Sequence, residues 1–247
     1  MFFQADARTS WAGSIAACME YPHNRPYTAD DLVRIITLLR DPVNGCPWDK
    51  VQTHTSIRMN FLEEAYEAVD ALDLDDPVLM CEELGDVLMQ VAFHTCMEQE
   101  TGRFTWEQVC DGVCQKLIER HPNIFGTQPG YEGITDWDAL KNKEKGRRTL
   151  ADDLESVPRA MPALMRAAKL QKRAARHGAA LQGADAAALA DAAENLQTAQ
   201  PASAQAEQAV GELLFAAANL ARQAGVDPEQ ALQKANEAFC TAAGQVA

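Results

Sequence analysis

The stretch EELGDVLMQVAFH, residues 82–94, decides the fold. Its apolar side chains are spread around most of a helix: Leu84, Val87, Leu88, Met89, Val91, Ala92 and Phe93. A segment that is apolar on most sides is typical of a buried helix. Glu83 and Asp86 nevertheless stand on one side of it, one helical turn apart, and burying two carboxylates is costly unless a partner neutralises them.

A second acidic segment precedes this one along the chain. In FLEEAYEAVD, residues 61–70, the acids Glu63, Glu67 and Asp70 fall within a stripe roughly 60° wide, and Glu64 lies on its flank. An EExxE pattern by itself is more typical of a solvated helix face that pairs with Lys or Arg. Its meaning therefore depends on what lies beside it.

The two acidic segments are expected to face each other. Only residues 73–77 connect the two helices, which favours adjacent, antiparallel packing. No Lys or Arg lies between Met59 and Thr101, so local ion pairs at i,i+4 cannot neutralise either acidic face. Converging carboxylates repel each other, and Mg²⁺, which prefers oxygen ligands, would relieve that repulsion. The sequence thus indicates a site for a hard divalent cation.

The rest of the chain predicts an all-α protein. Breaking residues and N-cap residues place helices at four positions in the first half, namely 30–41, 56–72, 76–100 and 106–121. Thr28 or Asp30 would cap the first of these helices, Asp75-Asp76-Pro77 would begin the third and Thr105 would cap the fourth. No segment shows the alternation of a strand.

The second half of the chain is rich in alanine and repeats parts of the first. Two pairs of segments match, 84–94 with 210–220 and 106–116 with 228–238. In this match Ala209 stands where the first copy has Glu83. Pro158 and Pro162 mark the junction, and the change in composition places a boundary near residue 150. The second copy is expected to keep the packing residues and to lack an acid.

The net charge of −14 argues against binding to nucleic acid or to an anionic membrane surface. No apolar run approaches the roughly 18 residues of a membrane span. The N-terminal segment lacks the basic-then-apolar order of a signal peptide. The seven cysteines form no CxxC pair, which favours a reducing, cytoplasmic setting.

Three stretches of this sequence resemble one known family. They are residues 38–72 (LLRDPVNGCPWDKVQTHTSIRMNFLEEAYEAVDAL), 82–94 (EELGDVLMQVAFH) and 116–126 (KLIERHPNIFG). These stretches closely resemble MazG, a nucleoside triphosphate pyrophosphohydrolase of the all-α NTP-pyrophosphatase superfamily. The resemblance implies two tandem MazG-like helical-bundle domains, the second degenerate. We expect an N-terminal extension at 1–29, a MazG-like domain at 30–148 and the degenerate domain at 149–247.

The same resemblance implies an activity and a metal site. The expected reaction is Mg²⁺-dependent hydrolysis of an NTP or dNTP to the monophosphate and pyrophosphate by a homodimer, with Mn²⁺ as an alternative ion. The family's EExxE…ExxD pattern carries over onto five acids as metal ligands: Glu63, Glu64, Glu67, Glu83 and Asp86. Glu64, off the main stripe, is the candidate general base.

Candidate substrate contacts lie outside the acidic segments. Lys116 and Arg120, at i,i+4, would clamp phosphates, although a solvated helix end explains the pair equally well. Trp48 and Lys50 of CPWDK are candidates for contact with the nucleobase, and core packing is the alternative explanation for Trp48. His94 is expected to be a hydrogen-bonded core residue and not a ligand.

A non-catalytic protein derived from such an enzyme is the second hypothesis. It would be a nucleotide-binding or dimerising regulatory helical protein. The second copy offers only DAAEN at 191–195 and the sequence AVGE at 209–212, and alanine cannot ligate a metal. We therefore expect the second copy not to catalyse. The complete set of five acids in the first copy favours the enzyme.

Overall fold

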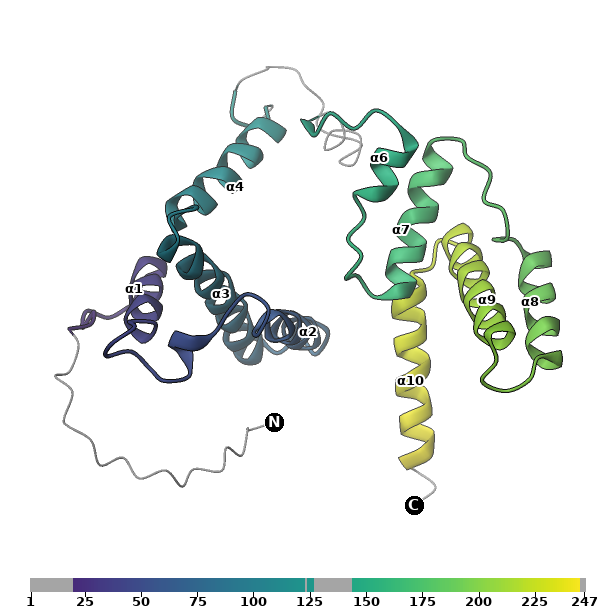
Figure 1. The fold of residues 1–247 in the computed structure, drawn as a ribbon, viewed down its shortest axis with the longest axis horizontal. Coiled ribbons are helices and arrows are strands. Elements are labelled where there is room, and N and C mark those ends of the chain that lie inside the picture. The colour runs from purple at the N-terminus through teal and green to yellow at the C-terminus, as the bar shows by residue number, and fades with distance from the viewer. Residues whose placement is uncertain (1–19, 123, 127–143, 245–247) are drawn as a thin grey trace. The chain divides into compact units, whose positions relative to one another are not determined.

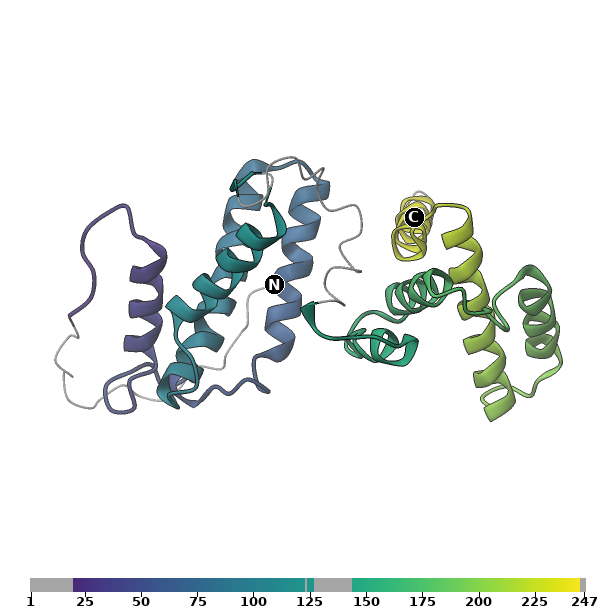
Figure 2. The same cartoon turned by 90° about the horizontal axis from the view of Figure 1, so that it is seen from above.

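The computed structural model describes residues 20–122, 124–126 and 144–244, and this part of the chain is helical without strands (Figures 1 and 2). The helices of the first half are α1 (Ala29–Leu39), the short 3₁₀ helix η1 (Asp49–Val51), α2 (Arg58–Asp73), α3 (Pro77–Glu100) and α4 (Trp106–Arg120). Those of the second half are α6 (Leu150–Glu155), α7 (Ala163–Arg176), α8 (Ala186–Thr198), α9 (Ala204–Gln223) and α10 (Pro228–Gly244). The all-α prediction is confirmed.

The helices begin where their N-cap residues predicted. Thr28, and not Asp30, caps α1 in a capping box with Asp31, and Thr105 caps α4 in the same way with Gln108. Asp76 caps α3, and Pro77 occupies the first turn, where its missing N–H costs nothing. Gly102, at φ +69°, follows the end of α3.

The chain divides into two compact units, residues 1–133 and 134–247. The division between the two units falls within residues 127–143, which lie outside the described part. The domain limit predicted at 148/149 therefore remains a prediction. Residues 1–19 of the predicted N-terminal extension lie outside the described part as well. None of the described helices combines the length and the hydrophobicity that crossing a bilayer requires.

In the first unit, α1, α2 and α4 all pack on α3. The core gathers around the C-terminal half of α3 and consists of Ile36, Ile57, Ala92, Phe93, Cys96, Met97 and Trp106. The N-terminal half of α3 is less covered, since Leu84 is 51% and Leu88 39% exposed. The expectation that residues 82–94 are buried therefore holds only for the end of this stretch, because the core formed by α1 and the start of α4 reaches only the second half of α3.

The second unit repeats this pattern of helix pairs. Helix α9 takes the place of α3 and packs against α7, α8 and α10. The additional helix α6 packs on α7 through Asp153, which is fully buried and paired with Arg173 at 3.0 Å and with Arg176 at 3.1 Å. These ion pairs leave the charge of Asp153 compensated within the core.

Candidate metal centre

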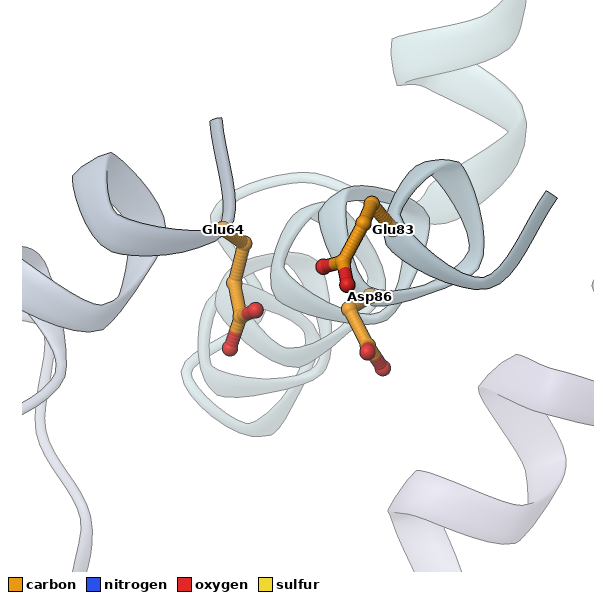
Figure 3. A group of neighbouring side chains, drawn as sticks. All are labelled: Glu64, Glu83 and Asp86. Carbon is orange, nitrogen blue, oxygen red and sulfur yellow. The ribbon is translucent and has the colours of Figure 1, made fainter. Parts of the chain in front are cut away.

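Three carboxylates meet between α2 and α3. Glu64 extends from α2 and Glu83 and Asp86 from α3, and one oxygen of each lies within 4.8 Å of the others. Figure 3 shows the three side chains projecting into the same space. All three are half-buried. Among the described residues, this is the one group of three or more potential ligands close enough to share a metal ion.

Small residues on α2 decide which acid faces α3. Ala68 and Ala71 are buried at 6% and 0% exposure, and Glu64 lies four and seven residues before them on the same helical face. The stripe of Glu63, Glu67 and Asp70, by contrast, is exposed. The expectation that Glu64 lies on the flank is therefore wrong, since Glu64 faces α3, whereas Glu67 of the expected stripe does reach Glu83 on α3. The alanines permit close approach of the two helices, and Glu64 stands at the edge of their contact.

Within the described residues, no Lys or Arg forms an ion pair with the carboxylates of this cluster. Burial, followed by repulsion from Asp86, raises the pKa of Glu64 above its ordinary value. Burial, followed by repulsion from Glu67, likewise raises the pKa of Glu83. One oxygen of Glu83, Oε2, is buried without a hydrogen-bond partner. A cation would satisfy that oxygen, and a set of carboxylate oxygens suits Mg²⁺ or Mn²⁺.

Gln90 borders the cluster on the side of the protein core. It lies one turn after Asp86 on α3, is 7% exposed, and its Nε2 donates to Glu64 Oε1 at 3.4 Å. Its own Oε1 is buried and has no partner. The sequence-based hypotheses gave Gln90 no role. Its spacing of four residues from Asp86 was the available signal.

A histidine pair ties the loop before α2 to α3. His54 Nδ1 and His94 Nδ1 are 2.7 Å apart, and their rings are stacked with centroids 5.0 Å apart. His54 Nε2 also contacts the buried carboxylate of Glu98 at 2.6 Å. His94, predicted to be a hydrogen-bonded core residue, does have a hydrogen-bond contact, but it is half-buried and not in the core. Burial, reinforced by His54, lowers the pKa of His94.

The candidate substrate contacts lie outside the carboxylate cluster. Trp48 is 57% exposed, so it is not a core residue, and the alternative explanation by core packing does not apply. Lys50 is half-buried, with Nζ 3.5 Å from the carbonyl of Pro42. Lys116 is exposed and Arg120 half-buried, one turn apart on α4.

Comparison with known proteins identifies the family of this chain. Residues 52–125 match the model of the MazG nucleotide pyrophosphohydrolase domain. The chain is 41% identical over 219 residues to the nucleoside triphosphate pyrophosphohydrolase of Escherichia coli (strain K12), covering 85% of this chain and 83% of that protein. It is 39% identical over 212 residues to the nucleoside triphosphate pyrophosphohydrolase/pyrophosphatase MazG of Thermotoga maritima, covering 85% and 82%. The chain therefore belongs to the MazG family.

Proposed function

We propose that this chain hydrolyses nucleoside triphosphates, ribo or deoxy, to the monophosphate and pyrophosphate with the help of a divalent cation. The observation that carries the proposal is the convergence of Glu64, Glu83 and Asp86 in a half-buried place, where no described Lys or Arg pairs with them. The relatives, whose matches span most of both chains, are named as nucleoside triphosphate pyrophosphohydrolases, which supports the same reaction. The free thiols among the described cysteines support a cytoplasmic setting.

In this proposal Glu64, Glu83 and Asp86 hold the ion, with Glu67 beside Glu83 and Glu63 at the exposed rim. When bound, Mg²⁺ or Mn²⁺ would neutralise phosphate charge and lower the pKa of an attacking water. The three central carboxylates are half-buried, and water therefore screens their mutual repulsion less than at an exposed surface. A bound cation would remove that repulsion.

Glu64 is the candidate general base. Its Oε1 accepts the bond from Gln90, which fixes the orientation of the carboxylate and leaves Oε2 to accept a proton from water. Gln90 would then position the base without touching the substrate.

The remaining contacts would bind the nucleotide. Lys116 and Arg120 share one face of α4 and carry the positive charge for the phosphates. The exposed indole of Trp48 offers a flat surface to a nucleobase, with Lys50 two residues away.

A homodimer is part of the proposal. Apolar side chains are at least 39% exposed along α2 and the first half of α3: Met59, Tyr66, Val69, Leu72, Leu84 and Leu88. Exposed apolar side chains on two neighbouring helices are typical of protein interfaces. Sedimentation equilibrium measures the mass directly, and Tyr66→Asp should shift it toward the monomer.

The test of the activity is product analysis. Incubation with a panel of NTPs and dNTPs, with Mg²⁺ or Mn²⁺ and separately with EDTA, should give monophosphate and pyrophosphate in equal amounts only with metal. Asp86→Asn should remove turnover, and it should also remove the increase in Tm that Mg²⁺ gives the unaltered protein. Nucleotide binding without turnover would instead favour the non-catalytic regulatory protein.

A further inference from the structure

A hollow of about 570 Å³ lies in the second unit between α7, the end of α9 and the start of α10. No residue of α8 lines it, so it is distinct from the place between α8 and α9 that corresponds to the site between α2 and α3. Three basic side chains line it, Lys169 and Lys172 from α7 and Arg222 from α9. We call it the basic pocket. Its size is within the range of small-molecule sites.

The cations of the basic pocket lack acidic partners. Within the described part of the chain, Lys169, Lys172 and Arg222 form no ion pair. On the same helix α7, Arg173 and Arg176 are paired with the buried Asp153. Helix α7 therefore carries two arginines that pair with a buried acid and two lysines, Lys169 and Lys172, that form no ion pair within the described residues.

Asp227 is the acidic residue that lines this hollow, and it is engaged elsewhere. Its Oδ1 accepts bonds from the backbone N–H groups of Glu229 and Gln230 and thereby caps α10. One carboxylate against three cations leaves a surplus of positive charge, although the whole chain carries −14. Converging like charges repel each other unless an anion lies among them.

Arg222 is held in place and not free to turn away. Its Nε donates to Asn219 Oδ1 at 2.9 Å, and Asn219, which is 2% exposed, donates through Nδ2 to the carbonyl of Ala184 at 2.6 Å. The terminal Nη groups of Arg222 remain available for a ligand. A guanidinium fixed by a buried amide is a pre-organised anion contact.

We propose that the basic pocket binds a nucleoside polyphosphate without a metal ion. The phosphates would lie among Lys169, Lys172 and Arg222, since a terminal phosphate carries about −1.5 to −2 at pH 7. The thioether side chains of Met161 and Met165, which line the same hollow, provide apolar contact for the nucleoside. This site is independent of the proposed hydrolysis. It lies in the second unit, which has Ala209 where the first has Glu83, and it uses no carboxylate ligands.

Calorimetric titration with ADP in EDTA tests this proposal on the full chain. EDTA removes divalent ions, so the acidic cluster cannot hydrolyse the nucleotide. We expect saturable binding that Lys169→Ala/Lys172→Ala weakens at least tenfold and that Arg222→Gln also weakens. The double variant Lys145→Ala/Lys234→Ala removes the same charge from exposed positions outside the pocket and should bind ADP as the unaltered chain does.

Several results would overturn the proposal: no saturable binding of ADP, equal weakening by both double variants, or no weakening by the pocket variants. Glu83→Ala should leave this binding intact, and its loss would place the nucleotide at the acidic cluster instead. Tripolyphosphate and adenosine separate the two parts of the ligand. Tripolyphosphate binding as tightly as ADP would overturn the contribution assigned to the methionines. None of these measurements depends on turnover.

Discussion

The helix pairs α2–α3 and α8–α9 pack against corresponding helices of their units but carry different side chains at the positions of the metal site. Glu83 on α3 corresponds to Ala209 on α9, which is 2% exposed, and Asp86 corresponds to the exposed Glu212. A hollow of about 690 Å³ persists beside α8 and α9, lined among others by Asp191 and Glu212. Within the described residues, no group of three potential metal ligands forms there.

The difference between the pairs extends to α4 and α10. The match of residues 106–116 with 228–238 aligns Lys116 with Ala238 and, one turn further on, Arg120 with Ala242. The second unit has thus lost both the acid and the cations that the proposal assigns to catalysis, while α9 still packs against α7, α8 and α10. It follows that this fold does not need the acids. In the first unit, burial and repulsion between the acids raise the pKa of Glu64 and of Glu83, which is a cost that function explains.

Glu83→Ala copies the second unit's residue into the first and should have the largest effect on activity. We expect turnover of NTPs to fall at least about 100-fold, since even supporting residues of metal sites cost 10–100-fold. The fold should persist, because Ala209 is accommodated at the corresponding place. Steady-state kinetics with circular dichroism as the folding check would measure this, and Glu82→Ala, at an exposed position of α3, is the matched control. Turnover retained within threefold would refute the assigned role of Glu83.

The existence and limits of the helices could be predicted because they depend on local chemistry. Thr28, Asp76 and Thr105 satisfy the free N–H groups of a first turn, and such caps can be identified from sequence alone. The exposure of Leu84 could not be predicted in this way. It depends on how far neighbouring helices reach along α3, and periodicity carries no information on that.

The acids of the site could be named from the pattern, but their arrangement could not. The spacing of the acids predicts that the charged stripe of α2 faces α3, whereas the buried residues of α2 are Ala68 and Ala71. Small residues carry little weight in a hydrophobic pattern even though they permit the closest helix packing. The histidine pair was out of reach for a different reason, because His54 and His94 are 40 residues apart and their contact is purely tertiary.

Ala209→Glu is the reverse exchange and should affect stability most. Glu83 is half-buried at the edge of its unit, whereas Ala209 is 2% exposed, so a carboxylate there would be desolvated without a partner. We expect a loss of at least about 2 kcal/mol in the free energy of unfolding, measured by urea denaturation. Gln205→Glu adds the same charge at an exposed position of α9 and should change stability little. Equal stability of the two variants would mean that the two helix pairs are still interchangeable.

The dependence of stability on pH provides a smaller contrast. The folded-state pKa of Glu83 lies above its unfolded value of about 4.5, so its proton favours the folded state. That contribution is present below pH 4.5 and is lost as pH rises through the folded-state pKa. In metal-free buffer, Glu83→Gln should therefore melt above the unaltered chain at pH 8, and the difference should vanish toward pH 4. A difference in Tm that grows on acidification would contradict the repulsion inferred here.

Glu212→Ala should have the smallest effect. Glu212 is exposed, and its Oε1 accepts a bond from Gln208 Nε2 at 2.8 Å one turn away on the same helix. Such exposed contacts contribute little, and surface substitutions usually stay within about 0.5 kcal/mol, or roughly twofold in a rate. We therefore expect kcat/KM within about twofold of the unaltered chain in the same assay that detects the loss in Glu83→Ala. Because Glu212 and Asp86 occupy corresponding positions, a tenfold fall would mean that the second unit still contributes a carboxylate to turnover, and the division of labour between the two pairs would have to be abandoned.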